Sequence, residues 1–316
     1  MNQKDIIYHI AQYIEPKYYS RLILINKFIH KQIETICKSY INNIGFHSCV
    51  YYMHTYTNTY IMNQKIISLC NKHSITFSCN IQLIILSRKN LANVPDEIYF
   101  LDKLKTLYLC NNNISIFSRS MIHMTNLQLL HLGNNLLKKL PVEICDLPNL
   151  TSLNISNNKI SYLPIKIKTM QNLNIIEMCL NKFRTFPHEI LCLIGLKKIN
   201  LNYNYILNIP MNISKLSNLQ ILKLRGNVIK IFNKKICCLP NLYYLGLGYN
   251  YIKKIPKKIY KLDNLRHLSL CSNMIEKIGN LCLLTNLNYL NLKQNILKKY
   301  PNELCCLTNL HRLRLI

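Results

Sequence analysis

Histidine and cysteine residues gather before residue 81, where their side chains could serve as zinc ligands. They are His47, Cys49, Cys70, His73 and Cys79. Structural zinc sites commonly draw two ligands from one tight C-x-x-C knuckle. Only Cys70 and His73 have a knuckle-like spacing, and one such pair supplies half a site. The spacing therefore favours scattered core or surface residues, and we expect no metal and no cofactor.

Signatures of catalysis are equally hard to find. The sequence has no P-loop, no G-x-G-x-x-G, no H-E-x-x-H and no G-x-S-x-G. Four of its 13 acids recur at equivalent spacing, at Glu97, Glu143, Glu189 and Glu303, and most of its 14 cysteines do the same. Such regular recurrence indicates packing or solvated surface, so we expect no enzyme.

Basic and aromatic residues alternate in the C-terminal half, at spacings that would place them on one face. This candidate partner-binding set is Lys197, Lys198, Tyr203, Lys223, Arg225, Tyr243, Tyr244, Tyr249, Arg266, His267, Tyr289, Lys293 and Arg312. The only acid at the corresponding positions is Glu177. Aromatic rings interleaved with Arg and Lys suit the recognition of acidic protein surfaces or phosphates.

A repeat of 23 residues positions these side chains. Its consensus is L-x-x-L-x-L-x-x-N-x-L-x-x-L-P-x-x-I-x-x-L-x-x, and its clearest copy is LQLLHLGNNLLKKLPVEICDLPN from Leu127 to Asn149. Self-similarity at this period is typical of a solenoid. Full copies begin at Ile81, Leu104, Leu127, Leu150, Leu173, Leu196, Leu219, Leu242, Leu265 and Leu287, and a truncated eleventh begins at Leu310.

Each repeat position has a physical role. The L-x-x-L-x-L segment predicts a short strand in a parallel sheet, with positions two, three, five, seven and eight facing solvent. Asn at position nine ends the strand, and its amide can satisfy backbone groups that the turn leaves unpaired. Pro at position fifteen suits the turn that follows, since it has no N–H to satisfy.

This pattern resembles the typical leucine-rich-repeat family, in its L-P-x-x-I subclass, over about three-quarters of the chain. The resemblance implies an α/β solenoid with a concave parallel β-sheet that usually binds protein. We expect a helical segment at 1–40, an irregular connection and cap at 41–80, and a solenoid of ten repeats plus a truncated eleventh at 81–316.

The helical segment resembles an F-box. That family's pattern of a helix, an acidic-Pro turn and L-x-x-L-x-x-V-x-K matches Ile10, Ile14, Pro16, Leu22 and Ile25. The resemblance implies that these residues dock on a Skp-type adaptor of a cullin ubiquitin ligase. The family's leading Leu-Pro and its Trp are absent, however, so the alternative is a helical cap on the end of the solenoid.

Composition and charge indicate a basic intracellular protein. Forty Lys and Arg against 13 acids give a formal net charge of +27, which reflects either AT-rich codons or an anionic partner. No signal peptide and no apolar run of about 18–20 residues is evident. We therefore expect a cytoplasmic location, reduced thiols and no membrane contact. The codon bias suits a large DNA virus or another AT-rich intracellular organism.

The leading hypothesis is a scaffold that binds a protein partner on its concave face. Its sharper form is the substrate receptor of a cullin-type ubiquitin ligase. One alternative, by fold analogy, is a regulator of a small GTPase or phosphatase. Another is electrostatic nucleic-acid binding, which is disfavoured because lysines are spread over several surfaces and no nucleic-acid motif is present.

Overall fold

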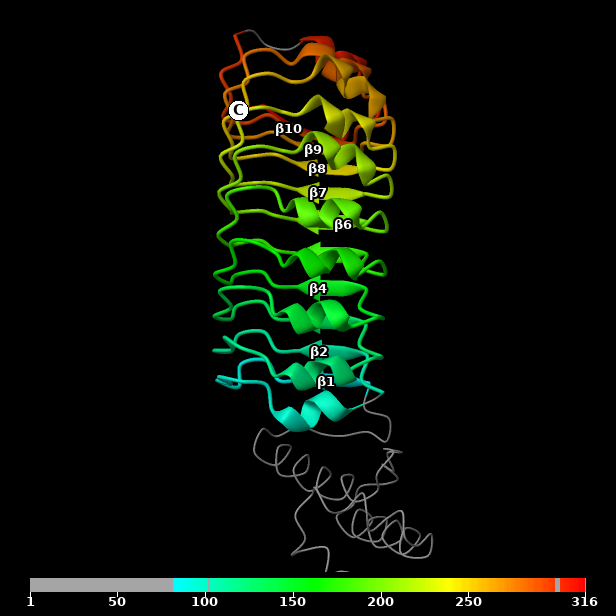
Figure 1. Ribbon diagram of the computed structural model, residues 1–316. Coiled ribbons are helices and arrows are strands. Elements are labelled where there is room, and N and C mark those ends of the chain that lie inside the picture. The colour runs from blue at the N-terminus through cyan, green and yellow to red at the C-terminus, as the bar shows by residue number, and fades with distance from the viewer. Residues whose placement is uncertain (1–81, 102, 299–301, 316) are drawn as a thin grey trace, which may run out of the picture.

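The structure, a computed structural model, describes residues 82–101, 103–298 and 302–315 (Figure 1). The predicted helical segment at 1–40, the connection at 41–80 and the five zinc candidates lie outside these residues. In the described chain each repeat contributes one turn of a regular column, with a short strand on one side and a short helix opposite. No helix in this part is long and apolar enough to span a bilayer.

Eleven strands of three residues form one parallel sheet in chain order, as the repeat predicts. They are β1 Leu83–Ile85, β2 Thr106–Tyr108, β3 Leu129–His131, β4 Ser152–Asn154, β5 Ile175–Glu177, β6 Lys198–Asn200, β7 Ile221–Lys223, β8 Tyr244–Gly246, β9 His267–Ser269, β10 Tyr289–Asn291 and β11 Arg312–Arg314. The register never slips, so equivalent repeat positions pair along the whole sheet; Lys198, Ile221 and Tyr244, for example, are successive partners.

The helices of the described residues are all short 3-10 turns on the side opposite the sheet (Figure 1). They are η1 Asp96–Phe100, η2 Arg119–His123, η3 Val142–Asp146, η4 Ile165–Thr169, η5 His188–Cys192, η6 Met211–Lys215, η7 Lys234–Cys238, η8 Lys257–Lys261, η9 Gly279–Leu283 and η10 Asn302–Cys306. The position-fifteen proline stands directly before most of them, for example Pro210 before η6 and Pro256 before η8. Proline fits this place because its fixed φ leads into the turn and no N–H is lost.

Aliphatic side chains fill the space between the sheet and the helices. The leading, fourth and sixth residues of each central repeat are buried, as Leu219, Leu222 and Leu224 illustrate. Each buried side chain of this kind stabilises the fold by about 1.5–3 kcal/mol. One repeat cannot cover its own apolar face, so stability comes from stacking.

Asparagine at position nine forms a continuous ladder. The Asn204 amide donates to the carbonyls of Met178 and Leu201 at 3.0 and 3.2 Å, and its oxygen accepts the N–H of Phe183 at 3.1 Å. Equivalent bonds recur in the other repeats from Asn112 to Asn295. Each Asn thus joins its own repeat to the preceding one, and its predicted role in satisfying the turn is confirmed.

Position eight has an unusual backbone. In all ten full repeats its φ is positive, a left-handed conformation that favours Gly and Asn. Asn111, Asn134 and Asn157 occupy it in the N-terminal half, whereas Tyr203 and Tyr249 occupy it further along with φ of 54° and 55°. Two tyrosines therefore adopt a left-handed backbone conformation that is more favourable for Gly and Asn.

Candidate functional site

The solvent face of the sheet presents the first and third residue of each strand, and the middle residue is buried on β1 to β10 but exposed on β11. On β7 these are Ile221 and Lys223, and on β8 they are Tyr244 and Gly246. The residues just after each strand, at positions seven and eight, extend the same face. Because the register is constant, side chains at equal positions lie one strand apart, about 4.8 Å.

Arg225 lies at the centre of this face, between two tyrosines. Its Nε donates to the Tyr203 hydroxyl at 2.9 Å, and its Cζ lies 4.1 Å from the centre of the Tyr249 ring. Its Nη1 is 3.8 Å from the Cys271 sulfur. The last distance is long for a strong bond, so the two tyrosines fix the guanidinium. We call Tyr203, Arg225, Tyr249 and Cys271 the Arg225 site.

Two glycines make room for this arrangement. A Cβ on Gly226 would lie 2.5 Å from the Tyr203 ring, which therefore extends across the glycine toward Arg225. A Cβ on Gly248 would lie 2.7 Å from the Cys271 sulfur. Both glycines are among the seven in the whole chain. They are required because side chains of the neighbouring repeat occupy the space above them.

An aromatic row runs beside the Arg225 site, from β8 to β10. The Tyr244 and His267 rings are 5.9 Å apart, and the His267 and Tyr289 rings are 6.0 Å apart. The Lys223 ammonium lies 5.4 Å from the centre of the Tyr244 ring. Burial raises the pKa of Tyr244, with Tyr289 adding to the effect and Arg225 opposing it. The phenol therefore stays neutral at pH 7 and available as a hydrogen-bond donor.

A cavity lies where the chain enters strands β7 to β9, and three of the predicted residues line it. Tyr243, Arg266 and His267 line this cavity of about 460 Å³ together with Gln220, Asn241 and Asn264. His267 also belongs to the aromatic row. The cavity and the row therefore form one continuous surface of rings and cations.

The other predicted residues lie apart from this surface. Lys198 on β6 forms an ion pair with Glu177 at 2.5 Å, so its charge is largely neutralised. Lys197 is exposed just before β6, and Lys293 is exposed after β10. Arg312 is exposed on β11, four strands from β7, or about 19 Å along the sheet.

Sequence reasoning missed several contributors to the face. Cys271 was assigned to packing, and Gly226 and Gly248 were not singled out. The stretch LGLGY, which holds Gly248 in a chain so poor in glycine, was the signal that could have indicated a close side-chain approach there, and Gly226 stands outside it. Apart from their spacing of 21 residues, nothing in the sequence indicated that Glu177 and Lys198 form an ion pair.

A second polar cluster lies on the N-terminal half of the same face. The amide of Asn154 contacts His131 Nε2 at 2.6 Å, and the Asn154 oxygen accepts the Ser156 N–H, which fixes the amide orientation. His131 Nε2 is therefore an acceptor and the imidazole is neutral. Burial lowers the pKa of His131, with Glu177 opposing the effect.

The chemistry of this face is that of recognition. Across the described residues no group of three His, Cys, Asp or Glu side chains could hold a metal ion. The Arg225 site and the aromatic row instead offer a fixed guanidinium, several rings and phenol hydroxyls. Such a set can hold a carboxylate or an aromatic side chain of another molecule.

Comparison with protein families gives matches to one kind of repeat. The family described as leucine rich repeat matches residues 79–137 and 194–252, and a second leucine-rich-repeat description matches residues 149–170. A search of curated proteins finds no match.

Solved structures give matches of the same kind. A leucine-rich-repeat protein of Leptospira interrogans is 30% identical, with a TM-score of 0.59, over 71% of this chain and 70% of that one. The plant peptide hormone receptor RGFR1, solved with RGF2, is 27% identical with a TM-score of 0.62, over 75% of this chain and 40% of the receptor. The functional domain of InlJ from Listeria monocytogenes is 22% identical with a TM-score of 0.64, over 74% and 48% of the two chains, and shows likeness of fold.

Proposed function

Because this chain belongs to the leucine-rich-repeat family, we propose that the concave face of its sheet binds a protein partner through the Arg225 site and the aromatic row. The fold is a scaffold of the kind that generally binds protein. We propose in addition where on this scaffold the partner binds and which chemical groups the partner presents. We infer that the partner presents a carboxylate to Arg225 and apolar or aromatic side chains to the surrounding rings.

The observation that carries the proposal is the held position of Arg225. A guanidinium has five N–H donors, and the structure engages Nε with Tyr203 and directs Nη1 toward Cys271. The remaining donors suit a carboxylate. Because Tyr203 and Tyr249 already restrict the side chain, less conformational entropy is lost when a partner binds.

Residue composition also supports a protein surface as the partner. Tyr and Arg are the residue types that dominate binding energy at protein interfaces. The plant peptide hormone receptor, 27% identical, is solved in complex with its hormone. That complex supports a polypeptide as the class of ligand for the present chain.

The proposal is tested by affinity purification from the source cells, followed by reconstitution with the recovered partner. Arg225→Glu and Tyr249→Ala are compared with Arg184→Glu, a charge reversal at an exposed residue outside the proposed site. We expect a partner that wild type and Arg184→Glu retain and that both site variants lose, in nuclease-treated extract. Equal recovery with every variant would refute the site.

Nucleic acid would behave differently in the same experiment. Its binding would be lost after nuclease treatment and would weaken steeply with salt, because lysine and arginine release counterions from phosphates. A partner retained under those conditions supports the protein-binding proposal. A partner that disappears contradicts it.

The narrower role as substrate receptor of a cullin-type ubiquitin ligase rests on Ile10, Ile14, Pro16, Leu22 and Ile25, which lie outside the described residues. We propose it on the sequence resemblance alone. Purified full-length chain and a Skp-type adaptor should then form a complex that Ile10→Asp with Leu22→Asp abolishes. Lack of adaptor binding by folded wild-type chain would leave the helices as a cap.

A further inference from the structure

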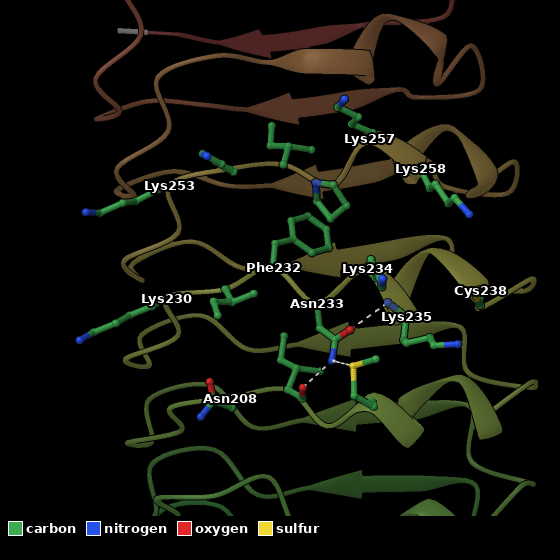
Figure 2. Close-up of a pocket in the computed structure, with 16 residues that line it drawn as sticks. Asn208, Lys230, Phe232, Asn233, Lys234, Lys235, Cys238, Lys253, Lys257 and Lys258 are labelled. Atoms are coloured by element: carbon green, nitrogen blue, oxygen red, sulfur yellow. Dashed lines mark hydrogen bonds between the residues drawn. The ribbon is translucent and has the colours of Figure 1, made fainter.

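A second candidate surface lies where the chain leaves the sheet and enters the 3-10 helices. It is a groove of about 1180 Å³ between the turns that precede η6, η7 and η8 (Figure 2). Lysines line both of its sides. On one side they include Lys230 and Lys253, and Lys254 also lines the groove. On the other they are Lys234, Lys235, Lys257 and Lys258.

The floor of this lysine groove is apolar and firmly held. Phe232 lies at its centre and is 4% exposed, whereas Ile231 and Met211 are 67% and 53% exposed. Asn233 replaces the position-fifteen proline here. Its amide donates to the Ile209 carbonyl at 2.7 Å, and its oxygen accepts the Lys235 N–H at 2.9 Å. The floor is thus joined to the preceding repeat, and apolar surface stays open to solvent.

The positive charge of the groove has no counterpart within it. No Asp or Glu lines it, and among the described residues none of the groove lysines takes part in the ion pairs, which involve lysines elsewhere such as Lys166, Lys198 and Lys298. Glu276, whose field reaches Lys253, is itself held by Lys298 at 2.8 Å. Seven ammonium groups therefore repel one another around one apolar floor, and an anionic ligand would relieve that repulsion.

We propose that the lysine groove binds an extended acidic peptide whose carboxylates meet the two rows of lysine and whose apolar side chains contact Ile231 and Met211. In an extended peptide alternate side chains point to opposite faces, so one face can be apolar while acids flank it. This site is separate from the concave face and does not depend on the function proposed for it.

The same observations disfavour nucleic acid as the ligand. Single-stranded nucleic acid binds through exposed aromatic rings on which bases stack, and the one aromatic ring lining this groove, Phe232, is buried. Exposed aliphatic surface between the lysines contributes most to binding when a ligand covers it with apolar groups.

The test measures fluorescence anisotropy of a short labelled peptide in which glutamate alternates with leucine, with full-length chain. Lys253→Glu with Lys254→Glu is compared with Lys138→Glu with Lys139→Glu, which occupy the same two repeat positions far from the groove. Ile231→Ser is compared with Ile116→Ser, again an equivalent and exposed position. All six residues are exposed, and urea unfolding verifies that each variant is folded.

We expect the groove pair to weaken peptide binding about tenfold and the control pair to change it less than about twofold. Ile231→Ser should weaken binding severalfold, and Ile116→Ser should leave it unchanged. A polyglutamate peptide and a single-stranded oligonucleotide of equal charge should bind more weakly than the Glu-Leu peptide. Equal loss in both lysine pairs, no effect of Ile231→Ser, tighter oligonucleotide binding, or no peptide binding would each overturn the proposal.

Discussion

Replacing Gly226 with alanine should destabilise the chain through two separable effects. The first is backbone strain, because Gly226 has φ of +66°, where an L-residue is unfavourable. The second is a collision, because the new Cβ would lie 2.5 Å from the Tyr203 ring. A displaced ring cannot keep the 2.9 Å hydrogen bond from Arg225.

The two effects have different controls within the chain. Gly279 has φ of +58°, and a Cβ added there would have no neighbour within 4 Å. Gly279→Ala therefore measures the backbone strain alone. Left-handed strain costs about 1–2 kcal/mol, and loss of one hydrogen bond costs about 1 kcal/mol more. We therefore expect Gly226→Ala to lower the free energy of unfolding by about 1 kcal/mol more than Gly279→Ala.

Urea unfolding followed by circular dichroism gives both values. In a Tyr203→Ala background the ring is gone, so Gly226→Ala should then cost no more than Gly279→Ala in the wild type. The reasoning is refuted if Gly226→Ala and Gly279→Ala cost the same in the wild type. It is refuted equally if the extra cost of Gly226→Ala persists without the Tyr203 ring.

Three further predictions concern residues at defined positions of the repeat. Asn204→Ala should cost about 2–4 kcal/mol in urea unfolding, since it orphans buried backbone groups; Asn295→Ala, at a partly exposed copy, should cost less. Leu180→Asn should raise the free energy of unfolding by about 1 kcal/mol, because Asn tolerates the left-handed conformation found there at φ 55°; an unchanged urea midpoint would contradict this. Burial lowers the pKa of His131 below its usual 6.5, so the unfolded chain protonates first. Stability present at pH 7 should therefore fall as the pH drops below about 6.5, an NMR titration should find the lowered pKa, and His131→Gln should reduce the pH dependence.

The parallel sheet, its buried leucines and the asparagine ladder could be predicted from the sequence, because the residue at each of these repeat positions plays the same role in every repeat. Position nine shows this well: the stacked amides that satisfy the turn were inferred from Asn alone and are present from Asn112 to Asn295. The parallel sheet and its buried Leu positions follow from the same periodicity. Residues 1–80 lie before the first repeat and lack its periodicity, and the hypotheses made for them stay predictions.

The details of the site could not be predicted because they depend on contacts between repeats. The sequence indicates that Lys198, Arg225 and Tyr249 face solvent, but not which of them pair. Lys198 is held by Glu177, whereas Arg225 lies between two rings. These outcomes depend on side-chain conformations, and that of Tyr203 depends in turn on Gly226 in the next repeat. A periodic pattern gives positions, and the variable residues decide the contacts.

The left-handed backbone at position eight argues that the Arg225 site is more than framework. Asparagine adopts this conformation with little strain, as at Asn111, Asn134 and Asn157. Tyr203 and Tyr249 carry a cost of about 1–2 kcal/mol each in the same conformation. Their one contact with Arg225 returns about 0.5–1.5 kcal/mol apiece. The contacts with Arg225 therefore offset the backbone strain at best. Backbone strain concentrated at two solvent-facing rings is expected where a surface is shaped for binding, and it therefore supports the proposal that a partner covers both rings.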